Sequence, residues 1–168
     1  MSSSSLLSDE AFLRLPAVPG KQELLDGELI ELPPAKHSLS ALAKRLVRLL
    51  TAVLQDSRVW TEAAYWLERG RWLVPDVSVS WPDQAVFDDW FQRSPMIAIE
   101  NVSRGNTAEE LELKTARYLE HGAAEVWVIY PRTGRMVVNS PSGARHLGQG
   151  ETYFCELLGL DVPADHWQ

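Results

Sequence analysis

Two acidic residues stand in segments whose other residues favour β-strands. Asp76 lies in LVPDVSVSW and Glu100 lies in IAIENV. Aspartate is unfavourable in a strand, glutamate less so, and an unpaired buried carboxylate is costly. Because side chains alternate along a strand, the two acids can share one face at the ends of adjacent strands. Two neighbouring carboxylates repel unless a hard cation neutralises them, and Mg²⁺ takes one or two protein carboxylates together with water and substrate phosphates. The pair therefore indicates metal-assisted phosphodiester hydrolysis.

A lysine downstream of the second acid adds to this pattern. On a helical wheel Lys114 lies beside Leu111 and Tyr118, at the edge of the predicted buried face. It comes early in the helix that follows the Glu100 strand, so we expect it to reach back toward Glu100. A lysine in that place could orient the attacking water or neutralise charge on the pentavalent phosphate.

Each of these residues also has a structural explanation. Asp76 follows a proline and could cap a backbone turn. Glu100 could pair with an arginine, and Lys114 could be a surface lysine supported by Glu110 one helical turn earlier. Taken singly, the structural explanations are favoured. The ordered set of acid, acid and lysine on strand, strand and helix favours a site.

Further polar residues precede the first long helix. Glu23, Glu28 and Glu31 lie in the segment ELLDGELIELPP, and any of them could approach a metal from the far side. His37 stands just before the helix, where a local hydrogen-bonding role and a functional role are both open.

Periodicity and turn signals place these residues on elements. Asp26-Gly27 predicts a tight hairpin turn, and Thr107-x-x-Glu110 is a capping box that begins a helix ending near His121. The remaining elements are a short helix over 6–15, a helix from Ser38 or Ser40 to about Leu54, strands near 59–67, 72–80, 95–102 and 126–130, a polar loop over 82–94, and a β-meander over 135–154.

The strand, helix and strand over 96–130 form a βαβ unit, so these two strands should be parallel with a right-handed crossover. The predicted core order is αβββαβ in a mixed sheet flanked by helices, with β additions at both ends. We expect residues 1–20 to form a tail and a short helix, and residues 21–168 to form a single domain.

Composition limits the function classes. The 168 residues carry a formal net charge of −7 with an ordinary apolar content, and a single cysteine, Cys155, excludes an internal disulfide. No membrane span or secretory signal is recognisable, so a cytoplasmic protein is expected. The acid excess argues against a typical nucleic-acid binder. A phosphate backbone responds to the local field, however, so the whole-chain sum does not exclude a nuclease.

At this point a family resemblance is visible. The ordered pieces ELLDGELIELPPAKH, VPDVSVSW and PMIAIENVSRGNTAEELELKTARYLEHGAAEVWVIYP resemble the Uma2 (DUF820) family of endonucleases, within the PD-(D/E)XK restriction-endonuclease-like superfamily. The resemblance runs from about Lys21 to Gly159. It implies an α/β fold with a restriction-endonuclease-like sheet core and a divalent-metal nuclease site.

The resemblance also implies residue roles. It puts Asp76 on the aspartate of the PD motif and Glu100 on its second acid. The usual motif lysine falls where Val102 stands, and Lys114 in the following helix matches the substitute seen in Uma2-like sequences. Glu23 and Glu28 fall in the N-terminal segment of the family, and its histidine is matched by His37. Asn101, directly after the second acid, departs from the family pattern. Its side chain should face away from Glu100, while its carbonyl could still ligate metal.

The resulting hypothesis is a Mg²⁺- or Mn²⁺-dependent endonuclease that acts on DNA. Its catalytic set is Asp76, Glu100, Lys114, Glu28 and His37, with Glu23 as the alternative to Glu28, and its metal ligands are Asp76, Glu100 and Asn101. The alternative is a catalytically inactive binding or assembly module that keeps the nuclease fold. A homodimer is expected, since the seven tryptophans and the cluster of Phe87, Trp90 and Phe91 could build a dimer surface, although they could equally pack a core.

Overall fold

The computed structural model describes residues 6–55 and 58–167 of the chain. The helices are α1 (Asp9–Phe12), α2 (His37–Thr51) and α3 (Ala108–Glu120), with a 3-10 turn, η2, at Ala164–His166. The strands are β1 (Lys21–Leu25), β2 (Glu28–Leu32), β3 (Val59–Thr61), β4 (Tyr65–Glu68), β5 (Arg71–Leu73), β6 (Val77–Val79), β7 (Val86–Phe87), β8 (Trp90–Phe91), β9 (Ile97–Asn101), β10 (Glu125–Tyr130), β11 (Arg135–Ser140), β12 (Gly143–Leu147), β13 (Thr152–Cys155) and β14 (Leu160–Pro163).

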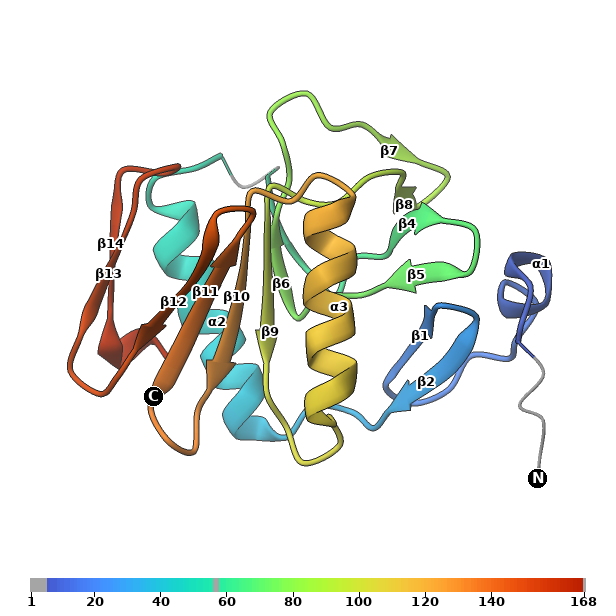
Figure 1. Ribbon diagram of the computed structural model, residues 1–168, viewed down its shortest axis with the longest axis horizontal. Helices are drawn as coiled ribbons and strands as arrows, with labels where there is room; N and C mark the ends of the chain where they lie inside the picture. Colours follow the sequence, from blue (N-terminus) through green and yellow to red (C-terminus); the bar gives the residue numbers. More distant parts are fainter. Residues whose placement is uncertain (1–5, 56–57, 168) are drawn as a thin grey trace.

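Within the described residues the strands form two six-stranded sheets and a β13–β14 hairpin. The central sheet has the order β12-β11-β10-β9-β6-β3, and the hairpin sheet has the order β2-β1-β5-β4-β8-β7. Along the chain, the central sheet and its helices read α2, β3, β6, β9, α3, β10 before the β11 and β12 additions. Strands β9 and β10 are parallel, as the predicted βαβ unit requires. Figure 1 shows the hairpin sheet beside α3 and the β13–β14 hairpin at the opposite end of the molecule.

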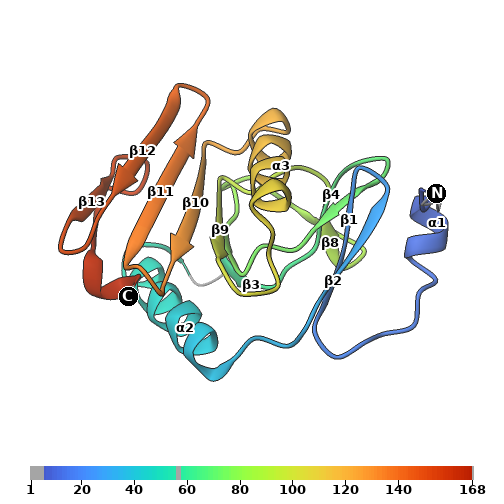
Figure 2. The ribbon, with the colours of Figure 1, turned by 60° about the horizontal axis from the view of Figure 1, so that its bottom comes forward.

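The two long helices cover opposite faces of the central sheet. On α2, Leu42, Leu46 and Leu50 pack in one core with Ile97 and Ile99 of β9. The other core holds Tyr118 of α3 with Ala98, and it continues to Tyr65 and Leu25 of the hairpin sheet. Figure 2 shows α2 and α3 on opposite sides of β9 and β10. Because side chains alternate along β9, Glu100 lies on the same face as Ala98, toward α3 and the hairpin sheet.

Several local predictions are confirmed. Asp26 and Gly27, with φ of 52° and 86°, turn β1 into β2. The Thr107 and Glu110 capping box begins α3, and Gly122 follows the end of that helix with φ of 98°. Each feature is a local one, since the residue types that a turn or a cap requires are adjacent in the sequence.

Other boundaries differ from the prediction. The first long helix begins at His37 after Lys36, so Ser38 and Ser40 lie inside its first turn and neither caps it. The strand predicted over 59–67 divides at Glu62, whose φ is 50°, so that β3 joins the central sheet and β4 the hairpin sheet. The strand predicted over 72–80 divides at Pro75, which has no N–H for a ladder hydrogen bond. The predicted loop over 82–94 contains the short strands β7 and β8.

Candidate active site

Strand β1 carries alternate charged residues toward the centre of the molecule. Glu23 is fully buried, and its Oε1 accepts a hydrogen bond of 2.6 Å from the backbone N–H of Val74. Lys21, two residues earlier on the same face, donates from Nζ to the carbonyl oxygen of Val74 at 3.0 Å. Both polar groups of the Val74 backbone are thereby satisfied by side chains of β1. This pairing ties β1 to the segment that leads into β6.

Asp76 stands directly before β6, beside the end of β9. The pairing of Val77 with Ile99 places Asp76 next to Glu100 across the two antiparallel strands. One Asp76 oxygen, Oδ2, accepts from the backbone N–H of Asn101 at 2.7 Å. The other oxygen, Oδ1, lies 2.6 Å from Lys21 Nζ. Asp76 is therefore held by the backbone of β9 on one side and by an ammonium group on the other.

Lys114 joins the remaining two acids. Its Nζ lies 2.8 Å from Glu100 Oε1, and 2.8 and 2.9 Å from the two oxygens of Glu23. The hydroxyl of Tyr118, one turn further along α3, donates to Glu100 Oε1 at 3.1 Å. Glu100 and Lys114 are only 3% and 1% exposed. We call Lys21, Glu23, Asp76, Glu100, Lys114 and Tyr118 the inner cluster.

Burial and charge set the protonation of the inner cluster. Burial raises the pKa of Glu100 to about 7, against the pull of Lys114 and Lys21. Burial also opposes the charged form of Lys114, but the carboxylates of Glu100 and Glu23 outweigh it and raise the pKa of Lys114. For Lys21, burial likewise opposes the charged form, but the nearby carboxylates, mainly those of Glu100 and Asp76, outweigh it and raise the pKa of Lys21. At neutral pH both lysines are therefore cationic.

The oxygen ligands of the inner cluster fit a small hard cation. Mg²⁺ binds through one or two protein carboxylates and keeps several waters, and Asp76 and Glu100 lie next to each other at the ends of neighbouring strands. The Glu100 contacts described above are both made at Oε1. No group of three or more His, Cys, Asp or Glu in the described part of the chain is arranged to hold a metal. The donor set therefore suits a partly hydrated ion on two carboxylates, not a closed protein cage.

The other predicted site residues lie outside the inner cluster. Glu28 is exposed opposite Leu25, at the turn end of the β1–β2 hairpin. Glu31 pairs with Gln22 on the opposite face of that hairpin from Glu23, and the two side chains are hydrogen-bonded at 2.9 Å. His37 is the exposed first residue of α2. Of the three N-terminal glutamates that the sequence left open, the structure brings Glu23 to the cluster.

Asn101 follows Glu100 on β9, so its side chain points to the other face of the central sheet, as expected. Asn101 is 5% exposed, and its side-chain Oδ1 is buried without a hydrogen-bond partner among the described residues. Its backbone N–H, not its carbonyl, makes the contact with the inner cluster that the structure records. The predicted ligation through the Asn101 carbonyl stays a prediction.

Sequence reasoning missed two members of the inner cluster. Lys21 is a lysine at the start of a strand, two positions from a glutamate, and that alternation was the available signal. Tyr118 was placed on the buried face of its helix, but the partner of its hydroxyl comes from a strand 18 residues earlier. Neither contact follows from spacing alone, because both join elements that meet only in the folded chain.

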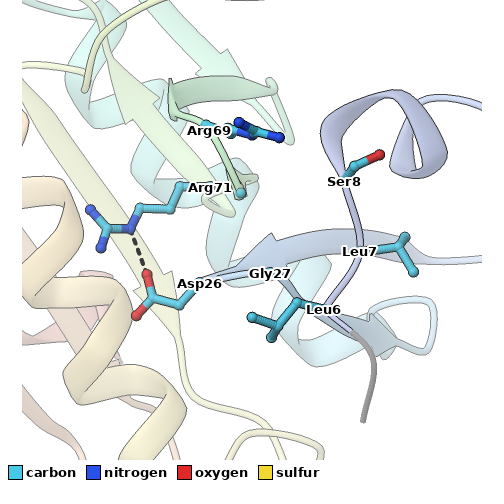
Figure 3. Close-up of a pocket in the computed structure, with 8 residues that line it drawn as sticks. Leu6, Leu7, Ser8, Asp26, Gly27, Arg69 and Arg71 are labelled. Atoms are coloured by element: carbon cyan, nitrogen blue, oxygen red, sulfur yellow. Dashed lines mark hydrogen bonds and ion pairs between the residues drawn. The ribbon is translucent and has the colours of Figure 1, made fainter.

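A pocket lies elsewhere, where the β1–β2 turn meets the residues before α1 and the β4–β5 turn. Figure 3 shows its lining, in which Asp26 is already bound by Arg71 and which also includes Leu6 and Arg69. None of the residues that line it belongs to the inner cluster. The inner cluster, where three carboxylates and two lysines converge, is the candidate active site, and this pocket is separate from it.

The central sheet with α2 and α3 on its faces, and with acids at the ends of two neighbouring strands, defines a restriction-endonuclease-like α/β protein. The chain belongs to the Uma2 family, because the family model described as "Putative restriction endonuclease" matches residues 9–157. The fold is similar to the crystal structure of a "putative nuclease belonging to DUF820" from Anabaena variabilis. The TM-score is 0.86 at 20% identity, over 96% of this chain and 97% of that one. Among curated proteins, none matches this sequence.

The family indicates a nuclease, that is, a hydrolase that acts on nucleic acid. None of the helices in the described residues is long and apolar enough to cross a membrane.

Proposed function

We propose that this protein is a Mg²⁺- or Mn²⁺-dependent endonuclease that hydrolyses phosphodiester bonds in DNA, with the inner cluster as its active site. The observation that carries the proposal is the pair of acids at adjacent strand ends, Asp76 and Glu100, with Lys114 bound to Glu100 from the following helix. Asp76 and Glu100 would hold the ion. A bound ion of this kind polarises the phosphate and lowers the pKa of a coordinated water.

The residues of the chain supply the geometry for this chemistry. Lys114 and Tyr118 both contact Glu100 Oε1, so they fix the orientation of that carboxylate. Asn101 N–H does the same for Asp76. Lys114 also binds Glu23, which is anchored on the Val74 backbone, so Glu23 acts through Lys114 as a positioning residue. The cationic lysines offset the growing negative charge of the phosphate.

The test is cleavage of supercoiled plasmid with Mn²⁺, with EDTA, and with two variants. Glu100→Gln keeps the size of the side chain but removes its charge, and we expect a loss of at least about 100-fold, because metal charge stabilisation is worth several kcal/mol. Glu112→Gln makes the same change at an exposed position of α3 and should cleave as the wild type does. Cleavage that persists in EDTA, or in Glu100→Gln, would contradict the proposal.

A second candidate is a non-catalytic module that keeps the nuclease fold. The observation in its favour is that Lys21 and Lys114 already neutralise part of the carboxylate charge. This candidate predicts no gain in melting temperature with Mn²⁺, because no site would bind the ion. A gain that Asp76→Ala abolishes would exclude it.

We also propose a homodimer, because two active sites suit the cleavage of both strands of a duplex. Of the predicted aromatic surface, Phe91 is buried against Tyr65, with ring centroids 4.8 Å apart, whereas Phe87 is 57% exposed. Sedimentation equilibrium tests the assembly, and a monomer at high concentration would contradict it.

A further inference from the structure

The two lysines of the inner cluster are held differently. Lys114 contacts two carboxylates and its side chain is 2% exposed. Lys21 contacts a single carboxylate, that of Asp76, together with the Val74 carbonyl, and its side chain is 11% exposed. The ammonium group of a lysine is a compact charge on a flexible stem. Lys21 is therefore the lysine that can leave its carboxylate at lower cost.

The oxygen that Lys21 contacts is the Asp76 oxygen that makes no recorded hydrogen bond to the backbone. Asp76 Oδ2 is committed to the backbone N–H of Asn101 at 2.7 Å, and that bond fixes the carboxylate against β9. Asp76 Oδ1, 2.6 Å from Lys21 Nζ, is the oxygen left for a cation. A divalent ion and the Lys21 ammonium cannot both take the same position on this oxygen.

We propose that Lys21 is a displaceable internal cation that competes with the divalent ion for Asp76 Oδ1 and so sets the metal affinity of the site. The inference rests on the proposed function. In the metal-free protein Lys21 neutralises Asp76 and holds it in place. When the ion binds, the ammonium leaves Oδ1 and stays near the site on its four-carbon stem, where it can contact a phosphate.

The first test measures Mn²⁺ affinity by titration calorimetry, without substrate. Lys21→Met removes the competing charge and keeps most of the alkyl chain, so we expect Mn²⁺ to bind at least about tenfold more tightly than to the wild type. Lys44→Met removes the same charge from an exposed position of α2 and should leave the affinity unchanged. Equal or weaker binding by Lys21→Met would overturn the proposal, because Lys21 would then support the metal site or have no influence on it.

The outcomes separate the two proposals. If neither the wild type nor Lys21→Met binds Mn²⁺, the metal-dependent function fails, and the competition fails with it. If the wild type binds Mn²⁺ and Lys21→Met binds no more tightly, the role of Lys21 fails alone.

A second measurement needs no change at Lys21. Reductive methylation of the wild-type protein, quantified by mass spectrometry, reports how free each ammonium group is. Added Mn²⁺ should increase methylation of Lys21 and leave Lys114 protected, and Asp76→Asn should abolish the effect of Mn²⁺. If Mn²⁺ does not change the methylation of Lys21, the ammonium is not displaced and the proposal is overturned.

Discussion

Two networks of charged side chains join the same two parts of the chain. One part is β1 with its turn, and the other is α3. In the inner cluster Glu23 binds Lys114, and three residues further along each element Asp26 binds Arg117 at 2.5 Å. The second pair belongs to an outer network in which Arg71 also contacts Asp26, and Arg117 also contacts Glu120. Arg71 further contacts Glu68, which lies 3.3 Å from His121. The two groups share their supporting elements and differ in burial.

Burial changes what these contacts are worth. The side chains of Asp26 and Arg117 are 32% and 19% exposed, whereas those of Glu23 and Lys114 are 0% and 2% exposed. Exposed pairs contribute about 0–1 kcal/mol, and salt screens them. A buried ion pair repays its desolvation cost only with excellent geometry, and apolar residues of the same shape are often as stable. Modest stabilisation explains the outer network. The inner cluster is costly to bury, which is expected if it is the active site that we propose.

The largest difference should appear when the shared cation of the inner cluster is removed. Lys114→Met leaves Glu23 and Glu100 buried beside each other without their common partner, so we expect a loss of about 3–5 kcal/mol in the free energy of unfolding. Urea unfolding measures this loss, with Lys44→Met as the surface control. A loss below about 1 kcal/mol would mean that the inner cluster is no more costly to break than the outer network.

The pH dependence of stability gives the next largest effect. Burial raises the folded-state pKa of Glu100 from an ordinary 4.5 to about 7, so between these values the folded protein binds more protons than the unfolded chain. The contribution of Glu100 is therefore fully present below pH 4.5 and is lost as the pH rises through about 7, by an amount on the order of 3 kcal/mol. Glu100→Gln should lack this decline. If the stability curves of the two proteins were parallel over that pH range, the folded-state pKa of Glu100 would not be raised.

The sequence predicted those features of the two networks that depend on local patterns. Asp76 and Glu100 were singled out because an acid is unusual in a strand, and Lys114 because it lies at the edge of the buried face of the following helix. The hairpin turn at Asp26 was found because its residue types suit the turn. These signals need only a few adjacent residues.

The remainder depends on which strands meet. Strands β4 and β5 belong to the hairpin sheet, although the sequence predicts that they are continuous with β3 and β6 of the central sheet. The breaks at Glu62 and Pro75 interrupt segments that are otherwise strand-like. The choice of Glu23 over Glu28 depends on how β1 lies against α3, and periodicity does not report that docking. Lys21 was missed for the same reason, because its carboxylate partner is 55 residues away in the chain.

In the outer network, the expected effect of pH on stability through Asp26 is smaller than that through Glu100 and has the opposite sign. Hydrogen bonds from Arg117 and Arg71 lower the pKa of Asp26, with Arg117 the larger cause. Asp26 therefore contributes stability above its ordinary pKa of 3.8, and the contribution is lost as the pH falls through the lower folded-state value. Asp26→Asn should cost about 1 kcal/mol or less at neutral pH, and the cost should shrink in high salt. A cost that is large and insensitive to salt would place Asp26 with the inner cluster.

The smallest expected effect is at Glu28, and its value lies in the contrast with Glu23. Both glutamates lie on the same hairpin, and both were candidates for the same role. Glu23→Gln removes a buried charge that Lys114 and Val74 N–H both contact, so plasmid cleavage should fall by at least about tenfold. Glu28→Gln changes an exposed side chain opposite Leu25. Cleavage should therefore stay at the wild-type rate and the free energy of unfolding should change by less than about 0.5 kcal/mol. If Glu28→Gln abolished cleavage while Glu23→Gln did not, the hairpin would have to present its turn end to the substrate. The active site would then lie closer to the outer network than to the inner cluster.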